Sequence, residues 1–216
     1  MCSGEGHEPP WKEGETRTLD GEIVICAHGY HASRTAWDAL KFAPGPVLCL
    51  VEVEPVEERA DKLASRSRRL IKAVNVEREL REFAADCAER VLHFYEEAYP
   101  GDQRPRAAIA TARAYAKGEA TDEGLATARA AAADAGAAAW GAAADAARAA
   151  TGAAWGAAAD AARAAAGTAA RAAARAATGA AAGAAEHKWQ YEQFDARLAH
   201  LFATEIAAWS LTQEGE

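Results

Sequence analysis

The pattern of apolar and polar positions divides the chain into a first part that favours strands and a longer second part with helical spacing. In the first part, Glu15 to Leu19 and Glu22 to Cys26 flank Asp20-Gly21. Aspartate followed by glycine accepts the positive φ angles of a two-residue turn. The pattern therefore predicts a β-hairpin across Asp20-Gly21.

A short helix and two further strands are predicted between this hairpin and residue 75. Ser33 or Thr35 can cap the helix, and Pro44-Gly45-Pro46 ends it because proline cannot continue a helix. The two strands are Val47 to Val53, expected to be buried and to end near Pro55, and Ala64 to Val74. Residues 1–75 are therefore expected to form a small α/β module.

From about Asn75 the apolar residues recur every three or four positions, which is the spacing of one helix face. The members of this stripe are Leu80, Phe83, Ala84, Cys87, Val91, Phe94 and Tyr95. They predict a helix over roughly 77–98. A second helix is expected between Asp102 and Gly118, and a third from Thr121.

Residues 126–185 are an alanine-rich stretch in which 39 of 60 residues are Ala and 7 are Gly. Alanine favours helix, whereas each interior glycine costs about 1 kcal/mol. The glycines therefore either divide the stretch into several helices or let another backbone come very close. The segment from Trp140 to Ala150 recurs without change from Trp155 to Ala165, which selection or replication slippage can produce.

The repeated block supplies candidate contact residues. Asp145 with Arg148, and Asp160 with Arg163, are favourable pairs three residues apart. Trp140 and Trp155 interrupt an alanine surface, so they either anchor neighbouring copies of the chain or cover the core from within. Small faces allow close helix packing, and we expect such faces to build homo-oligomers or filaments.

The last segment returns to an ordinary amphipathic pattern and predicts a C-terminal helix over 186–211. Its stripe consists of Tyr191, Phe194, Leu198, Leu201, Phe202, Ile206 and Trp209. The helix at 77–98 is the expected partner of this stripe. The sequence therefore predicts an α+β chain with two domains, a strand module over 1–75 and an alanine-rich helical domain over 76–216.

Charge and composition exclude several classes of partner. The net charge of −8 is unevenly distributed, with 13 basic and 20 acidic side chains in residues 1–103 but 9 and 6 in residues 104–185. Phosphate binding needs a concentrated basic surface, so nucleic acid is not the expected partner. No large apolar run reaches membrane-spanning length, and Met1 to Pro10 has no signal core, so a cytoplasmic protein is expected.

The cysteines and histidines offer few groups for chemistry. Cys2, Cys26, Cys49 and Cys87 are widely spaced, which favours reduced, mostly buried thiols over a zinc or disulfide framework. His28, Tyr30 and His31 form a dense cluster that could serve as general acid or base. The alternative is structural, with Tyr30 buried and the histidines bonding a loop. No further ligand completes a metal site, and no cofactor is expected.

Asp102, Arg104 and Arg106 form a second cluster at a predicted helix start. Arginines and free amides there favour an anion or a partner carboxylate. The alternative is a helix cap with intramolecular salt bridges to Asp86 or Glu89.

The segment Phe83 to Gly118, FAADCAERVLHFYEEAYPGDQRPRAAIATARAYAKG, resembles a bacterial family of alanine-rich helical proteins called putative immunity proteins. The resemblance covers roughly 77–195 and rests on a DCAE helix followed by PGDxRPRxAI. The residues of this chain that match the family's motif are Asp86, Cys87, Glu89, Asp102, Arg104, Pro105 and Arg106. It implies a helical fold and a role in bacterial conflict.

The upstream segment resembles a small uncharacterised module that often precedes such helices. This resemblance rests on GYHAS at Gly29 to Ser33 and on VLCLVEV at Val47 to Val53. More distantly, Gly29 to Ala32, the Ala36 to Phe42 helix and Leu50 to Val53 resemble the middle motif of the ADP-ribosyltransferase fold. Such enzymes also need an earlier nicotinamide-pocket strand, and fewer than 30 residues precede Gly29. That resemblance implies a degenerate or truncated relative.

Two functions of different classes follow. The first is a non-catalytic, immunity-like interaction protein that assembles with itself or binds a toxin. The alternative is an ADP-ribosyltransferase-like enzyme that uses the loop from His28 to His31. The first predicts assembly without nicotinamide binding, and the second predicts that the cofactor protects that loop.

Overall fold

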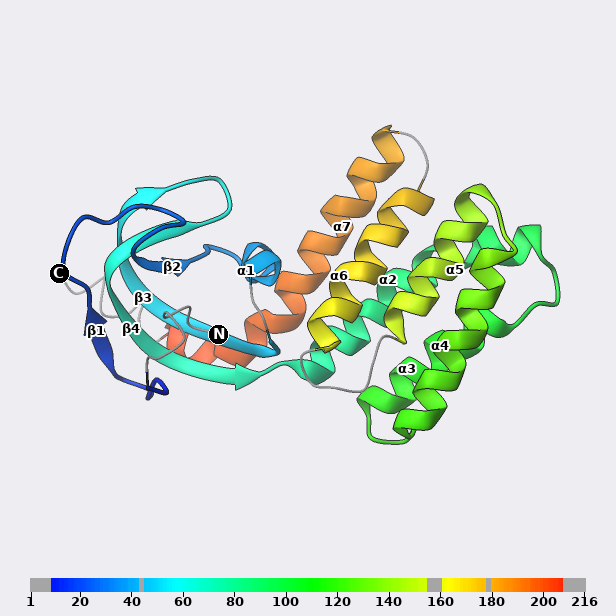
Figure 1. Cartoon of the computed structure of the whole chain (residues 1–216), viewed down its shortest axis with the longest axis horizontal. Coiled ribbons are helices and arrows are strands. Elements are labelled where there is room, and N and C mark those ends of the chain that lie inside the picture. The colour runs from blue at the N-terminus through cyan, green and yellow to red at the C-terminus, as the bar shows by residue number, and fades with distance from the viewer. Residues whose placement is uncertain (1–8, 43–44, 155–160, 178–179, 208–216) are drawn as a thin grey trace. The chain divides into compact units, whose positions relative to one another are not determined.

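A computed structural model describes residues 9–42, 45–154, 161–177 and 180–207, and leaves out the side chains of 161–165, 180 and 181. It contains an antiparallel sheet and a series of helices, as the predicted α+β class requires (Figure 1). The strands are β1 (Thr16–Thr18), β2 (Tyr30–Ala32), β3 (Val47–Glu58) and β4 (Leu63–Asn75). The helices are α1 (Ala36–Phe42), α2 (Glu77–Ala98), α3 (Arg104–Ala116), α4 (Asp122–Ala137), α5 (Gly141–Ala153), α6 (Ala161–Ala176) and α7 (Ala180–Ala199).

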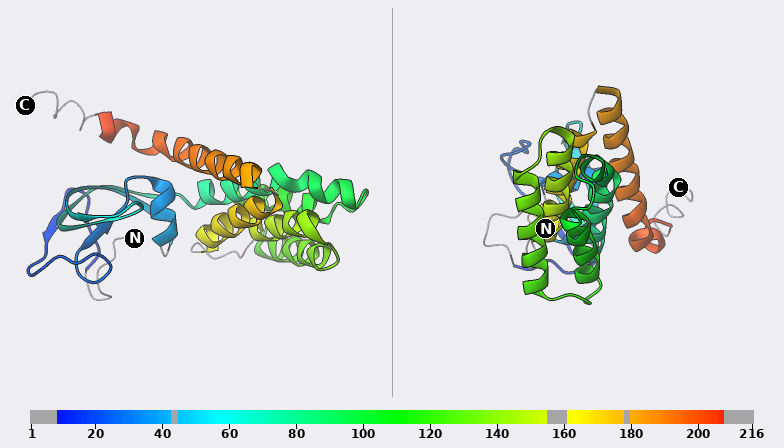
Figure 2. Two further views of the ribbon diagram at one scale, coloured as in Figure 1. Left: turned by 90° about the horizontal axis from the view of Figure 1, so that it is seen from above. Right: turned by 90° about the vertical axis from the view of Figure 1, so that its right-hand side faces the viewer.

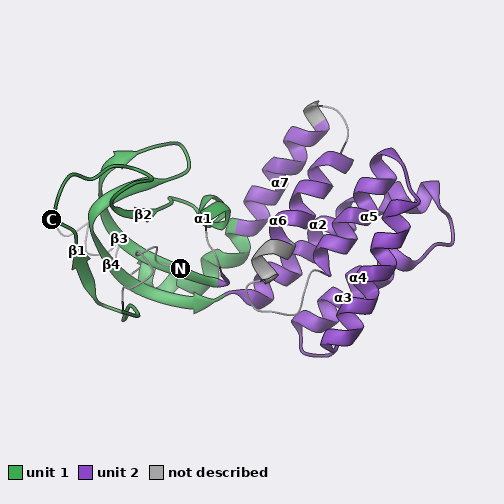
Figure 3. Ribbon diagram, viewed as in Figure 1, with its two compact units in different colours: residues 1–43, 47–75, 195–216 green, residues 44–46, 76–194 purple. Residues whose placement is uncertain are grey.

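The chain forms two compact units, coloured separately in Figure 3. Unit 1 comprises residues 1–43, 47–75 and 195–216, and unit 2 comprises residues 44–46 and 76–194. Unit 1 therefore takes in the end of the chain as well as the strand region.

The sheet of unit 1 is organised around β4. Strand β3 pairs with β4 along its length, while β1 pairs with residues 67–69 and β2 with residues 63–65 of the same strand. The buried side chains include Ile23, Ile25, Tyr30, Leu63, Ala64 and Leu70. One long strand thus organises the pairing that holds unit 1 together.

The predicted hairpin across Asp20-Gly21 is wrong. Gly21 does adopt a positive φ of 89°, but β1 pairs with β4, and the segment Glu22 to Cys26 is not a strand. That segment instead makes a tight turn, closed by reciprocal backbone hydrogen bonds of 2.8 Å between Val24 and His28. The hairpin of this unit joins β3 to β4. Pairing with the 13-residue strand β4 stabilises β1 more than a local hairpin across Asp20-Gly21 would.

The other predicted elements of unit 1 need smaller corrections. Helix α1 is confirmed, and Thr35 caps it by accepting a hydrogen bond from the amide of Asp38 at 3.1 Å. Strand β3 continues to Glu58 because the register shifts on both sides of Pro55, and a bulge tolerates a residue without an amide hydrogen. Leu48 to Val51 are half-buried, so β3 is not the buried strand expected.

Unit 2 is a helical bundle centred on α2, which packs against α3, α5 and α6 (Figure 2). The expected stripe of α2 is largely buried, and it includes Leu80, Phe83, Cys87, Val91 and Tyr95. The helix begins and ends at the predicted residues. Helices α3 and α4 are likewise confirmed, and Thr121 caps α4 by accepting from the Gly124 amide at 3.1 Å.

Both predicted roles of glycine occur in the alanine-rich stretch. Gly141, with φ of 59°, starts α5 after the break that follows α4. Gly152 lies inside α5, where an added Cβ would come within 3.0 Å of the Ala169 backbone nitrogen in α6. Helices α5 and α6 therefore approach closely through alanine and glycine, and this packing is intramolecular.

The C-terminal helix begins earlier than predicted and is interrupted. Helix α7 starts at Ala180, since the alanines before residue 186 favour helix, and it ends at Ala199. A 3₁₀ turn over His200–Phe202 follows, and residues 203–207 are helical again. Residues 208–211 of the predicted helix lie outside the described residues. Phe194 packs on Phe83 of α2, with ring centroids 5.0 Å apart, so the expected partnership of these helices is confirmed.

Candidate functional site

A ladder of charged side chains joins the antiparallel helices α2 and α3. At its centre, the Arg113 guanidinium donates to Asp86 at 2.8 Å and to Glu89 at 2.6 Å. The Glu89 side chain remains 51% exposed, so the cluster is accessible. The hydrogen bond from Arg113 lowers the pKa of Glu89, and the two carboxylates raise the pKa of Arg113. One guanidinium thus serves two carboxylates, which leaves the cluster with a net negative charge.

A second rung joins Glu96 of α2 to Arg106 of α3. Arg106 donates through Nε at 2.6 Å and Nη2 at 2.8 Å, a paired geometry that fixes both side chains. The hydrogen bond lowers the pKa of Glu96. The Arg106 side chain is 53% exposed, so this rung also faces solvent.

The turn between α2 and α3 is held by Asp102. Its carboxylate accepts hydrogen bonds from the Tyr95 hydroxyl at 2.6 Å and from the Arg104 backbone amide at 3.1 Å. The Arg104 guanidinium donates to the same carboxylate at 2.6 Å. The Arg104 and Tyr95 hydrogen bonds hold the pKa of Asp102 well below its usual range. Burial and the hydrogen bond to Asp102 raise the pKa of Tyr95 to about 12.

The motif does form intramolecular salt bridges, but the predicted partners of its arginines, Asp86 or Glu89, are wrong. Arg104 pairs with Asp102 and Arg106 with Glu96, whereas Asp86 and Glu89 pair with Arg113. The reason is the antiparallel course of the helices. Residues at the start of α3 lie beside the end of α2, so Asp86 and Glu89 lie beside the later turn that carries Arg113.

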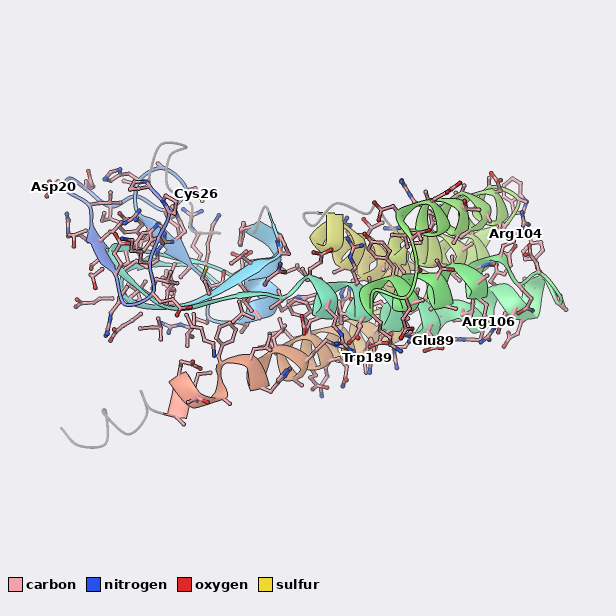
Figure 4. The ribbon with its side chains drawn as sticks, turned by 90° about the horizontal axis from the view of Figure 1, so that it is seen from below. Asp20, Cys26, Glu89, Arg104, Arg106 and Trp189 are labelled. Carbon is pink, nitrogen blue, oxygen red and sulfur yellow. The ribbon has the colours of Figure 1, made fainter. Side chains whose placement is uncertain are left out.

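Helix α7 extends this surface on the other side of α2. The Arg90 guanidinium lies 4.1 Å from the ring centre of Trp189 and donates to Glu186 at 2.9 Å. Glu89, Arg106 and Trp189 lie along one side of unit 2 in Figure 4. We call this surface the α7–α2–α3 face and define it by Asp86, Glu89, Arg90, Glu96, Arg106, Arg113 and Trp189.

Four members of this face were missed by sequence reasoning: Arg90, Glu96, Arg113 and Trp189. Arg113 follows Arg106 by seven residues, which places both on one side of α3. That spacing could have identified Arg113 as a member of the same face as Arg106. The pairing of Arg90 with Glu186 joins residues 96 positions apart, and no local pattern indicates it.

The candidate residues of the alanine-rich block are only partly described. Arg148 donates to Asp145 at 2.8 Å, as predicted from their spacing, and Arg175 of α6 approaches Asp145 at 3.4 Å. Trp140 lies at the start of α5 and is 86% exposed, so it does not cover the core. The repeat's second copy supplies Trp155 and Asp160, which lie outside the described residues, and Arg163, whose side chain is not described.

The histidine cluster lies in a loop and a short strand of unit 1. His28 donates through Nε2 to the Asp20 carbonyl at 2.9 Å, and His31 Nε2 accepts from the Cys26 amide at 2.9 Å. Burial, together with the nearby charges of Lys62 and Arg68, lowers the pKa of His31. Both imidazoles therefore bond backbone atoms.

The neighbouring Tyr30 is only 3% exposed, and its ring lies 4.7 Å from the Arg68 guanidinium. Among the described cysteines, Cys87 is buried, Cys49 half-buried and Cys26 exposed, and none forms a disulfide. Within the described ranges, no group of three or more His, Cys, Asp or Glu side chains is placed to hold a metal ion. None of the described helices is long and apolar enough to cross a membrane.

These features describe an α-helical domain that presents a charged, partly aromatic face. A family model described as "Imm-5 like putative immunity protein" matches residues 73–197, more than half of the chain. The chain therefore belongs to the Imm-5 like putative immunity protein family, which supports an immunity-like, non-catalytic role. No curated protein and no solved structure matches the chain.

The family match begins only at residue 73, so it does not extend over the module that carries His28, Tyr30 and His31. The resemblance of that module to the ADP-ribosyltransferase fold has no support from these comparisons. The resemblance of the helical region is confirmed.

Proposed function

We propose that this chain is an immunity protein that binds and blocks a protein toxin through the α7–α2–α3 face. The observation that carries the proposal is that every residue of this face lies within the region matched by the family model. The strand module then has no assigned part in toxin binding.

The composition of the face supports protein binding. Arginine and tryptophan are enriched among the residues that contribute most to protein interfaces. Glu89, Arg90 and Arg106 keep between 42% and 53% of their side-chain surface exposed, so a partner can reach them. Their intramolecular hydrogen bonds hold the side chains in place, which reduces the ordering cost on binding.

Charge supports a basic partner surface. Arg113 is shared by Asp86 and Glu89, and the whole chain carries a net charge of −8. Complementary charge speeds association and discriminates between partners. Lysine or arginine side chains of the toxin are therefore expected opposite the net negative cluster of Asp86, Glu89 and Arg113 at the centre of the face.

The test uses the proteins encoded by the genes that flank that of this chain. Each is expressed in a bacterial host with the full chain, and growth and co-purification are measured. We expect one of them to arrest growth alone, and to be neutralised and bound by the chain. Failure of the chain to bind or neutralise any growth-arresting neighbour would overturn the proposal.

Two charge reversals test the face itself. Glu89→Arg changes the centre of the ladder, while Asp134→Arg makes the same change in net charge at an exposed position of α4, which packs on α3 and α5. We expect Glu89→Arg to abolish protection and Asp134→Arg to retain it. Equal protection by both variants would exclude this face, provided that both melt like the wild type.

Self-association is a second proposal, favoured by the exposure of Trp140. An indole that is 86% exposed is an efficient anchor for a neighbouring copy. The alanine faces of α5 and α6 are buried against each other and α2, so Trp140 and not these faces would form the joint. Light scattering across a concentration series should show a mass increase that Trp140→Ala removes. A constant monomer mass would refute this proposal.

A further inference from the structure

Two buried polar side chains lie on helix α7, facing the helical bundle. Glu186 is 3% exposed and Gln190 is 1% exposed, and they lie one turn apart. The next residue of the same stripe is Phe194, which packs on Phe83. Two polar residues thus occupy positions where the rest of the stripe is apolar.

These side chains form a network that joins three helices. Glu186 uses both carboxylate oxygens, since Oε2 accepts from Arg90 Nε of α2 at 2.9 Å and Oε1 accepts from Gln190 Nε2 at 2.9 Å. The same amide nitrogen of Gln190 lies 3.0 Å from the Ala170 carbonyl of α6 and donates to it. The buried carboxylate therefore has a charged partner and a neutral one.

The neighbouring surface of α6 cannot by itself fix how far α7 is shifted along its axis. Among the α6 side chains that the structure describes (166–176), the buried ones are all alanine: Ala166, Ala169, Ala170, Ala172, Ala173 and Ala176. They include Ala170, whose carbonyl Gln190 of α7 reaches. A shift of one turn, about 5.4 Å, replaces one methyl group by another and one carbonyl by the next. Packing of α7 on these alanines therefore distinguishes poorly between neighbouring registers, and among the apolar contacts it is that of Phe194 with Phe83 of α2 that favours the observed one.

The network does distinguish them. If α7 shifts by one turn, Gln190 can find another carbonyl of α6, but Glu186 moves away from Arg90. A carboxylate buried without its cation is strongly unfavourable. A single buried polar group is known to set register between helices whose apolar contacts allow several.

We propose that Glu186 and Gln190 fix the register of α7 and thereby hold Trp189 in the α7–α2–α3 face. Trp189 lies between them in sequence, and its indole meets the Arg90 guanidinium that Glu186 binds. Glu186 and Gln190 are positioning residues, because they act on the face through Trp189 and Arg90. Their importance for toxin binding rests on the proposed function, whereas their control of register does not.

The experiment compares nuclear magnetic resonance spectra of the free, full-length protein. Trp189→Phe assigns the indole signal of Trp189. We expect one sharp signal in the wild type and several, or one broadened, in the double variant Glu186→Leu with Gln190→Leu. The variant should keep its helicity and melt near the wild-type temperature, because leucine replaces both buried polar side chains and the half-exposed Arg90, which loses Glu186, can be hydrated. One sharp, unshifted signal would overturn the proposal.

Two further variants separate register from stability. Phe194→Leu alters the same stripe without touching the network, and we expect a lower melting temperature with one Trp189 signal. Several signals in this control would show that any weakening of α7 has the same effect, and would overturn the proposal. If the double variant does not fold, Glu186→Leu alone takes its place, because the half-exposed Arg90 can then be hydrated. Several or broadened Trp189 signals would support the proposal, and one sharp, unshifted signal would overturn it.

Toxin binding then tests whether the register matters for the face. If several registers appear and binding is lost, Glu186 and Gln190 position the face as proposed. If several registers appear and binding is unchanged, the positioning role is overturned. A wild-type chain that binds no toxin would refute the proposed function and leave the spectra of the free protein unaffected.

Discussion

Replacing Gly152 by alanine tests the close packing of α5 on α6 against the intrinsic preference of glycine. An alanine in a helix is worth about 1 kcal/mol more than a glycine, so propensity alone predicts stabilisation. The structure places the new Cβ 3.0 Å from the Ala169 nitrogen, 3.1 Å from Thr168 Cγ2 and 3.3 Å from the Ala169 Cα. Two of these atoms are backbone, so α6 must move away by a few tenths of an ångström, and overpacking of this kind costs about 1–3 kcal/mol. We therefore expect a net destabilisation of about 1 kcal/mol.

Gly183→Ala is the matched control. It removes the same glycine penalty from α7, but among the residues that the structure describes its Cβ would meet nothing closer than the Ala177 carbonyl at 3.7 Å. This variant should gain about 1 kcal/mol, so the two variants should differ by about 2 kcal/mol. Urea unfolding followed by far-ultraviolet circular dichroism measures both, since the signal comes mainly from the helices. Stabilisation of Gly152→Ala to the same extent as Gly183→Ala would refute the close approach of α5 and α6.

Three further predictions concern single contacts. The pKa of Asp102 is lowered in the folded state, so its contribution to the free energy of unfolding should be complete above its unfolded pKa near 3.8 and be lost as the pH falls below that value. Melting temperatures of the wild type and Asp102→Asn should therefore converge in acid, and a difference that stays constant with pH would contradict this prediction. Cys26 is exposed with φ of 68°, so Cys26→Gly should raise the unfolding free energy by about 0.5–1 kcal/mol, and a loss would show that the cysteine makes a stabilising contact. Thr121→Ala should cost about 1 kcal/mol in urea unfolding, while Thr121→Ser keeps the α4 cap and should cost less.

The helices of unit 2 were predictable because their signals are local and repeated. The stripe from Leu80 to Tyr95 covers about four turns of α2, and Thr121 and Gly118 mark boundaries by capping and positive φ. The strands were less predictable. Asp20-Gly21 is a strong local turn signal, yet the long strand β4 provides the partner for β1. Pairing between residues about 50 positions apart cannot be read from a dipeptide.

The sequence motif predicted three of the seven residues that define the candidate site, Asp86, Glu89 and Arg106, but not their partners. Asp86, Glu89, Arg104 and Arg106 were identified from the motif, and each makes an ion pair. Which charges meet depends on how the antiparallel helices α2 and α3 are aligned. That alignment follows from the turn held by Asp102, and the sequence does not state it. Trp189 gave no signal because its role depends on a guanidinium from a distant helix.

Toxin binding through the α7–α2–α3 face is tested by calorimetric titration of the neighbouring toxin that the chain neutralises. The titration compares the wild type, Glu89→Arg and Asp134→Arg. We expect a tight complex for the wild type and Asp134→Arg, and a large loss of affinity for Glu89→Arg because its reversed charge would meet basic side chains of the toxin. Equal affinity of all three proteins would contradict the assignment of toxin binding to the α7–α2–α3 face.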